Sequence, residues 1–205
     1  MTEQASATLG SRQRIMDASC YLFEQKGFHA APMAELAATA KVSVGQIYRH
    51  FAGKDDIIVA IAERDAQANL ALLEEIFESA DRGELTPAEA IEMFAYNSMT
   101  RINAALWFEI QAESHRNPRV ADALRVLTDR HEDLVRRLAI KTQPALGDSE
   151  LEACVEIMTA CFFGLGMRTS LRPADPREIS RATACLIVRA LDLSIGCDDE
   201  GSGCG

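Results

Sequence analysis

Apolar residues recur every three or four positions along most of the chain, which is the spacing of one helix face. In the first such stretch, Ile15, Ala18, Leu22 and Phe23 share a face, and the stretch ends at Gly27, a residue type typical of helix C-termini. We find no convincing stretch of the strict alternation that predicts a strand. The pattern therefore predicts an all-α fold.

Capping signals divide the chain into separate helices. Pro32 is placed to open a short helix, and Ser43 with Gln46 has the spacing of a capping box. Similar signals occur at Thr86 with Glu89, at Asn117-Pro118, at Ser149 with Glu152, and at Asp175-Pro176. We expect about nine helices in all. The signals place eight of them, near 11–26, 32–40, 43–51, 54–79, 87–115, 118–142, 149–171 and 176–195.

These helices fall into three predicted segments. Residues 1–53 form a three-helix head, residues 54–196 form a larger helical bundle, and residues 197–205, rich in Gly and Asp, form a tail that we expect to be disordered.

Charge is distributed unevenly over the 205 residues. The net charge is −10, yet residues 1–55 carry +1 and the remainder −11. DNA binding is therefore restricted to the first quarter of the chain. No apolar run approaches the roughly 20 residues that span a bilayer, and the polar start from Met1 to Leu9 lacks the features of a signal peptide. We expect a cytoplasmic protein with no membrane contact.

The six cysteines form no metal-ligand pattern, so we expect no metal and no cofactor. Cys197 and Cys204 lie in the acidic tail, which disfavours the thiolate that redox sensing requires. The sequence also lacks a nucleophile triad, a phosphate-binding glycine loop and a paired-carboxylate motif, which argues against an enzyme.

Two short predicted helices, Met33 to Ala40 and Ser43 to Phe51, have the proportions of a helix-turn-helix. In the second helix Gly45 allows close approach to a duplex, and Gln46 is suited to reading adenine. The side chains suited to phosphates are Tyr48, His50 and Lys54, and Arg49 can reach a base edge or a phosphate. The alternative is a helical hairpin with an incidental basic rim. The apolar residues expected to hold the two helices together are Leu36, Ala37, Val42, Ile47 and Phe51.

The run from Met33 to Ile57, MAELAATAKVSVGQIYRHFAGKDDI, resembles the DNA-binding signature of the TetR family of helix-turn-helix regulators. The resemblance covers about residues 11–60. It implies base contacts from Val44, Gly45, Gln46 and Arg49, and phosphate contacts from Ser43, Tyr48, His50 and Lys54.

Two positions depart from the family pattern. Ala30-Ala31-Pro32 replaces the Thr or Ser that usually precedes the second helix, so a hydroxyl cap is missing. Lys41 stands in the turn where the family commonly has Gly, so either Lys41 adopts a positive φ or the turn differs slightly from that of the family.

The predicted helix over 87–115 is apolar nearly all round, which is typical of a central, buried helix that can line a ligand pocket. Glu109 lies in its apolar stripe, either as a counter-charge for an effector or as the partner of a core arginine such as Arg101 or Arg125. His131 is either a satisfied core histidine or a ligand contact. The candidate pocket residues for an apolar or aromatic effector are Phe94, Asn97, Arg101, Trp107, Phe108, Glu109, His131, Met158 and Phe162.

Apolar residues on both sides of the last two helices suggest that one side packs on the pocket and the other on a second subunit, the alternative being plain core. The resemblance implies a homodimer through these helices, bound to a palindromic DNA operator. The leading hypothesis is a repressor released by a small hydrophobic effector. The alternatives are a small-molecule binding protein and a ligand-independent regulator of the same fold.

Overall fold

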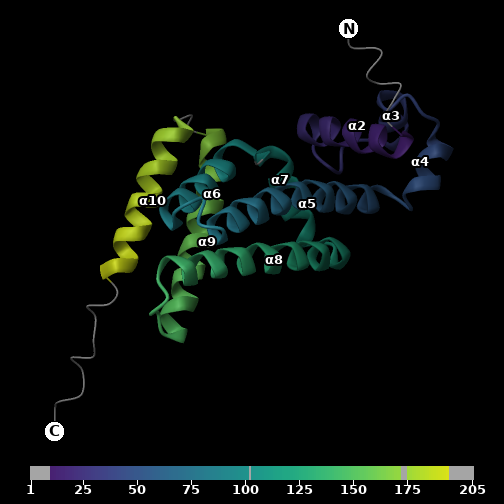
Figure 1. Cartoon of the computed structure of the whole chain (residues 1–205). Coiled ribbons are helices and arrows are strands. Elements are labelled where there is room, and N and C mark those ends of the chain that lie inside the picture. Colours follow the sequence, from purple (N-terminus) through teal and green to yellow (C-terminus); the bar gives the residue numbers. More distant parts are fainter. Residues whose placement is uncertain (1–9, 102, 172–174, 194–205) are drawn as a thin grey trace. The chain divides into compact units, whose positions relative to one another are not determined.

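The computed structural model describes residues 10–101, 103–171 and 175–193, and within these ranges the chain forms nine helices and no strand (Figure 1). The predicted all-α fold, with a three-helix head followed by a helical bundle, is confirmed. The helices are α2 (Ser11–Lys26), α3 (Met33–Thr39), α4 (Val44–His50), α5 (Lys54–Asp81), α6 (Pro87–Arg101), α7 (Ala104–Ser114), α8 (Pro118–Thr142), α9 (Asp148–Leu171) and α10 (Pro176–Leu193). The predicted tail, with Cys197 and Cys204, lies outside the described residues.

Most helix ends lie where the capping signals predict them. Gly27, at φ 82°, ends α2, and its N–H donates to the Phe23 carbonyl. Before α6, Glu89 Oε2 accepts the Thr86 N–H at 2.8 Å while Thr86 Oγ1 accepts the Glu89 N–H at 3.2 Å, so this capping box is formed.

The capping box predicted at Ser149 and Glu152 is wrong. The first turn of α9 is instead closed by Glu150, whose Oε2 accepts the Gly147 N–H at 2.9 Å. Glu152 pairs with Arg136 of α8, with Nη1 and Oε1 2.6 Å apart.

The single helix predicted over 87–115 is also wrong, because the structure has two helices there. Asn103 caps the second one: its side-chain oxygen accepts the Leu106 N–H at 3.2 Å, which begins α7. The helix is not buried all round either, since Met93, Tyr96 and Phe108 are exposed. The apolar period continues across the break, so periodicity alone could not reveal it.

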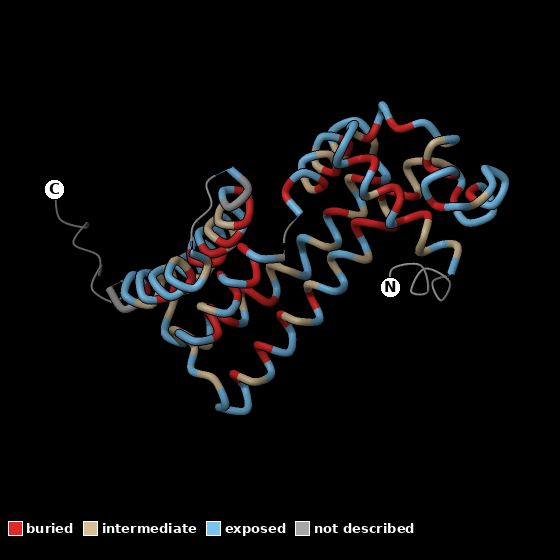
Figure 2. The backbone as a smooth tube through the Cα atoms, turned by 90° about the horizontal axis from the view of Figure 1, so that it is seen from above, coloured by how far each residue is buried: buried red, intermediate tan, exposed pale blue. Residues whose placement is uncertain are grey.

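The chain divides into two compact units, which we call unit 1 and unit 2. Unit 1 holds described residues 10–68 and 103–128, and unit 2 holds 69–101, 129–171 and 175–193. Helices α5 and α8 contribute residues to both. Each unit has its own apolar core, and Figure 2 shows buried positions alternating with exposed ones along the helices. The division at residues 53 and 54 into functional domains stays a prediction.

Unit 1 joins the three N-terminal helices to α7. Its core includes Ile15, Phe23 and Leu36 from the head and Leu106 and Ile110 from α7. The core of unit 2 is built from α5, α6, α8, α9 and α10. No helix among the described residues is long and apolar enough to cross a membrane.

Candidate nucleic-acid interface

Helix α4 buries one residue and leaves the others exposed. Ile47 is 0% exposed, whereas Val44, Gly45, Gln46, Tyr48, Arg49 and His50 are all exposed. The predicted apolar contacts between α3 and α4 are confirmed, because Leu36, Ala37, Ile47 and Phe51 share the core of unit 1 and Val42 packs against it. A short helix that buries a single side chain presents nearly all of its remaining surface to a partner.

Ser43 and Gln46 form the predicted capping box at the start of α4. Ser43 Oγ accepts the Gln46 N–H at 3.1 Å, and Gln46 Oε1 accepts the Ser43 N–H at 2.8 Å. The cap has a consequence for recognition. Reading adenine bidentately requires both the amide oxygen and the amide NH₂ of the side chain, and the oxygen of Gln46 is already engaged. In this arrangement the Nε2 donors of Gln46 are not used by the cap, whereas its oxygen already accepts one hydrogen bond.

Packing within the protein does not require a glycine at position 45. A Cβ added at Gly45 would have Ser43 Oγ, at 3.9 Å, as its near neighbour, which is ordinary van der Waals contact. A Cβ would therefore fit the fold, and it would add to the exposed surface of α4. This is the geometry expected where another backbone must approach closely.

Two further exposed groups of α4 differ in how far they are engaged. Tyr48 is 56% exposed. His50 Nε2 lies 2.6 Å from the Ser11 hydroxyl, which ties the end of α4 to the first turn of α2. Arg49 lies in the last turn of α4, where a positive charge interacts favourably with the helix dipole.

Lys54 is not placed as the sequence predicts. Its ammonium donates to three carbonyl oxygens of the segment between α2 and α3, those of Phe28 at 2.5 Å, His29 at 3.1 Å and Ala31 at 3.0 Å. An ammonium has three N–H donors, so all of them are used. Partial burial lowers the pKa of Lys54. The predicted phosphate contact would require at least one of these bonds to be exchanged.

The two departures from the family pattern have the expected structural effect. Lys41 adopts φ 54°, the only positive φ of a non-glycine residue within the described chain. The N-cap of α3 is Pro32, which makes no side-chain cap hydrogen bond, and the preceding Ala31 is fully buried.

The residues predicted to line an effector pocket are divided between the two units. Phe94, Met158 and Phe162 share the core of unit 2, and the rings of Phe94 and Phe162 lie 5.8 Å apart. Trp107 and Phe108 belong to α7 in unit 1, where Trp107 packs against the core and Phe108 is 53% exposed. The side chain of Arg101 lies outside the described part of the chain.

Two polar residues of unit 2 have unusual surroundings. Asn97 is 4% exposed; its Nδ2 donates to Asn69 Oδ1, while its own Oδ1 is buried with no hydrogen-bond partner among the described residues. Burial lowers the pKa of His131, which favours the neutral ring.

Glu109 has a partner that the sequence did not predict. Its Oε2 accepts the Phe28 N–H at 2.7 Å. Arg125, one of the two arginines considered as its partner, pairs instead with Asp122 at 3.4 Å.

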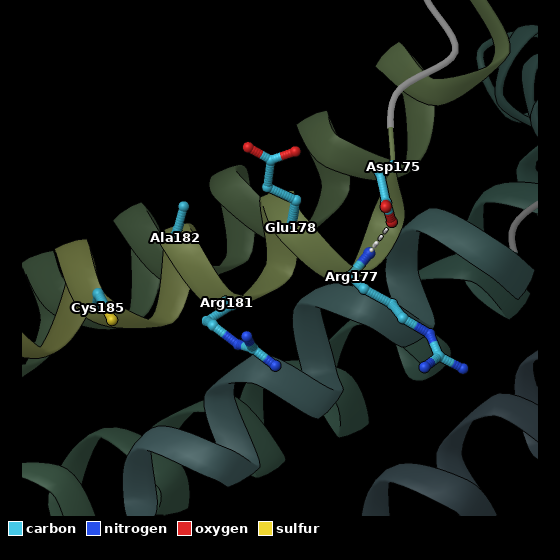
Figure 3. Close-up of a pocket in the computed structure, with 6 residues that line it drawn as sticks. All are labelled: Asp175, Arg177, Glu178, Arg181, Ala182 and Cys185. Atoms are coloured by element: carbon cyan, nitrogen blue, oxygen red, sulfur yellow. Dashed lines mark hydrogen bonds between the residues drawn. The ribbon is translucent and has the colours of Figure 1, made fainter.

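A surface pocket of about 580 Å³ lies on α10. Its lining residues are Asp175, Arg177, Glu178, Arg181, Ala182 and Cys185, and Figure 3 shows Glu178 and Ala182 pointing away from the two arginines. None of the predicted effector residues lines this pocket, and we assign no ligand to it.

The described residues contain no group of three or more His, Cys, Asp or Glu side chains able to hold a metal ion. Burial raises the pKa of Cys20 to about 11, so this thiol is protonated at neutral pH.

Comparison with known proteins agrees with this geometry. Residues 15–61 match the family of bacterial regulatory proteins named tetR. The HTH-type transcriptional regulator UidR of Escherichia coli (strain K12) is 33% identical over 115 residues, which cover 56% of this chain and 57% of UidR. The match thus spans little more than half the length of that relative.

Two further proteins are similar over most of the chain. The HTH-type nicotine-responsive transcriptional repressor HdnoR of Paenarthrobacter nicotinovorans is 22% identical over 84% of this chain and 90% of its own. The crystal structure of a transcriptional regulator from Pseudomonas aeruginosa PAO1 superposes with a TM-score of 0.79 at 18% identity, over 94% of this chain and 96% of that one. Over residues 15–61, therefore, the head of this chain is that of the tetR family of bacterial regulatory proteins.

Proposed function

We propose that this protein is a ligand-responsive transcriptional repressor that binds a double-stranded DNA operator through α4. The observation that carries the proposal is the exposure of α4, which buries only Ile47 and displays its other residues on a rigid, capped helix. UidR and HdnoR, which are an HTH-type transcriptional regulator and an HTH-type transcriptional repressor by name, support the same assignment. Such a protein acts as a regulator rather than an enzyme, and we expect it in the cytoplasm, where its operator is found.

The exposed residues divide into two proposed groups. Val44, Gly45 and Arg49 face base edges in the major groove, and Gln46 adds its Nε2 donors. Ser43, Tyr48 and His50 contact phosphates, which fix the position of α4 on the duplex. The engagement of Lys54 with three carbonyls favours an indirect role for this residue.

The repressor acts as a homodimer through α9 and α10. Ile157 on α9 and Leu186 on α10 are 67% and 65% exposed, an arrangement that leaves apolar surface for a second copy. A two-fold dimer places its two reading helices in successive major grooves, about 34–36 Å apart. The operator is then a palindrome whose two half-sites are one helical turn apart.

The proposed effector is a small apolar or aromatic molecule bound within unit 2. Phe94, Met158 and Phe162 supply apolar surface, Asn97 Oδ1 supplies an acceptor in need of a donor, and His131 is a further candidate in the same unit. HdnoR is nicotine-responsive by name, which supports an effector of this size. An effector that favours the DNA-free state by about 1–3 kcal/mol would weaken operator binding roughly 5- to 150-fold.

Selection from random duplex DNA by the purified protein, followed by sequencing, tests the proposal. We expect a palindromic consensus with two half-sites one turn apart. Absence of enrichment at moderate salt would contradict DNA reading and favour a small-molecule binding protein. With the operator in hand, compounds that raise the melting temperature are tested for release of the DNA. If none releases it, a ligand-independent regulator is the better description.

A further inference from the structure

Helix α7 contacts the end of α2 and the segment that follows it through three polar side chains. Asn103 Nδ2 donates to Glu24 Oε1 at 2.5 Å. Glu109 Oε2 accepts the Phe28 N–H at 2.7 Å, and Glu113 Oε2 lies 3.0 Å from His29 Nε2. All of these residues belong to unit 1, although the partners are about 80 positions apart in the sequence.

Glu109 supplies an acceptor for a backbone N–H that the end of α2 leaves without a partner in its own helix. Gly27, at φ 82°, turns the backbone away from the axis of α2, so the next residue lies beyond the end of that helix. Phe28 is 3% exposed, and a buried N–H requires an acceptor. Glu109 supplies it, and its carboxylate also lies directly against Gly27, 3.5 Å from where a Cβ would be.

The same segment is held from a second side. The ammonium of Lys54, the first residue of α5, donates to the carbonyls of Phe28, His29 and Ala31. The backbone of residues 28–31 therefore gives a donor to α7 and acceptors to α5. Two residues later the chain enters α3, whose position sets that of α4 through their shared core.

We propose that Glu109 is a positioning residue for DNA reading, holding the segment 28–31 to α7 so that a displacement of α7 reaches α3 and α4 directly. This inference rests on the proposed function, because it concerns how the reading helix is placed. Since α7 falls in the same compact unit as the head, a displacement of α7 either carries the segment 28–31 with it or breaks the bond to Phe28.

A merely structural hydrogen bond predicts a different outcome, so two readouts are needed. The first is hydrogen exchange of the Phe28 amide in the free protein, which reports the bond without reference to DNA. The second is affinity for the operator that the wild-type protein selects. In Glu109→Ala we expect Phe28 to exchange at least tenfold faster and operator affinity to fall about 5- to 50-fold, with helical content unchanged.

Conservative variants of Glu109 show whether the hydrogen bond itself is responsible for the change. Glu109→Gln retains a side-chain oxygen as acceptor, so we expect both readouts within about threefold of wild type. Glu109→Asp is one methylene shorter and should give intermediate values in both, which serves if Glu109→Ala does not fold. Gln111→Ala, two residues along α7, is the matched control and should change neither.

Each failure has its own meaning. Faster exchange at Phe28 with unchanged operator affinity would make Glu109 structural only and overturn the inference. Unchanged exchange of the Phe28 amide in Glu109→Ala would show that Glu109 does not make this hydrogen bond, which would also overturn the inference. If the wild-type protein selects no DNA, the proposed function fails first, and the inference falls with it.

Discussion

Lys54 shows at the scale of a single residue how a sequence can predict a charge without predicting its partner. The family signature implies a phosphate contact, yet the ammonium donates to three carbonyls between α2 and α3. Residue type and position identified Lys54 as important. The distance from Lys54 to that segment depends on how the segment packs against the start of α5, which a single sequence does not contain.

The salt dependence of operator binding distinguishes these two roles. Removing one phosphate contact lowers the slope of log affinity against log salt by about 1. For Lys54→Met we predict weaker binding with the slope unchanged, because the bonds that the substitution removes lie within the protein. Lys141→Met, which removes the same charge from a pair with Asp81 in unit 2, should leave both quantities unchanged. A slope reduced by about 1 in Lys54→Met would instead support the phosphate contact that the family signature implies.

The turn between α3 and α4 stores strain at Lys41. A non-glycine residue in the left-handed region costs about 1–2 kcal/mol relative to its usual conformations, and Lys41 adopts φ 54°. We therefore predict that Lys41→Gly raises the free energy of unfolding by about 1 kcal/mol. Urea denaturation measures the change. Ala38→Gly, at an exposed helical position of α3, should instead lower it by about 1 kcal/mol, and a decrease in both variants would contradict this explanation.

At the scale of helices, capping residues predicted where a helix begins better than apolar periodicity predicted whether it continues. The caps at Ser43, Thr86 and Asn103 are short-range patterns, and two of them were read correctly from the sequence. The third was missed because an apolar period continued across it. Asn103 followed by an apolar run was the signal that could have divided α6 from α7.

A substitution at Gln46 can keep the capping box of α4 and still change the charge that faces the proposed DNA. A glutamate at position 46 can accept the Ser43 N–H as the glutamine does, so Gln46→Glu should unfold at the same urea concentration as wild type. Its added negative charge faces solvent beside the proposed phosphates, so operator affinity should fall at least tenfold. Gln111→Glu changes the net charge equally on α7 and should bind normally. Equal binding by the two variants would show that position 46 does not face DNA.

At the scale of the whole molecule, the sequence predicted which residues share a face but not which faces meet. All of the DNA-contact candidates except Ser43 and Lys54 lie on α4, which displays them together. The pocket candidates came from several predicted helices, and the structure divides them between two units. Contacts such as Glu109 with Phe28, 81 positions apart, depend on the completed fold.

Dimerisation is a property of the whole molecule that the exposed apolar residues of α9 and α10 make testable. Sedimentation should give twice the mass of one chain for the wild type. Ile157→Glu combined with Leu186→Glu should give a monomer, because two charges would be buried without partners. The monomer should bind a single half-site weakly. A dimer that persists in this variant would place the interface elsewhere.

The outer surface of α4 enters the DNA groove in the proposed complex, and Gly45 tests this most directly. A leucine there fits the fold, where an added Cβ has ordinary contacts, and replacing a helical glycine stabilises by about 0.5–1 kcal/mol. The measurement is operator affinity beside melting temperature, with Ala71→Leu on the exposed face of α5 as control. For Gly45→Leu we predict an equal or higher melting temperature and at least a thirtyfold weaker affinity. A variant that melts normally and still binds the operator as wild type would contradict the proposed DNA interface.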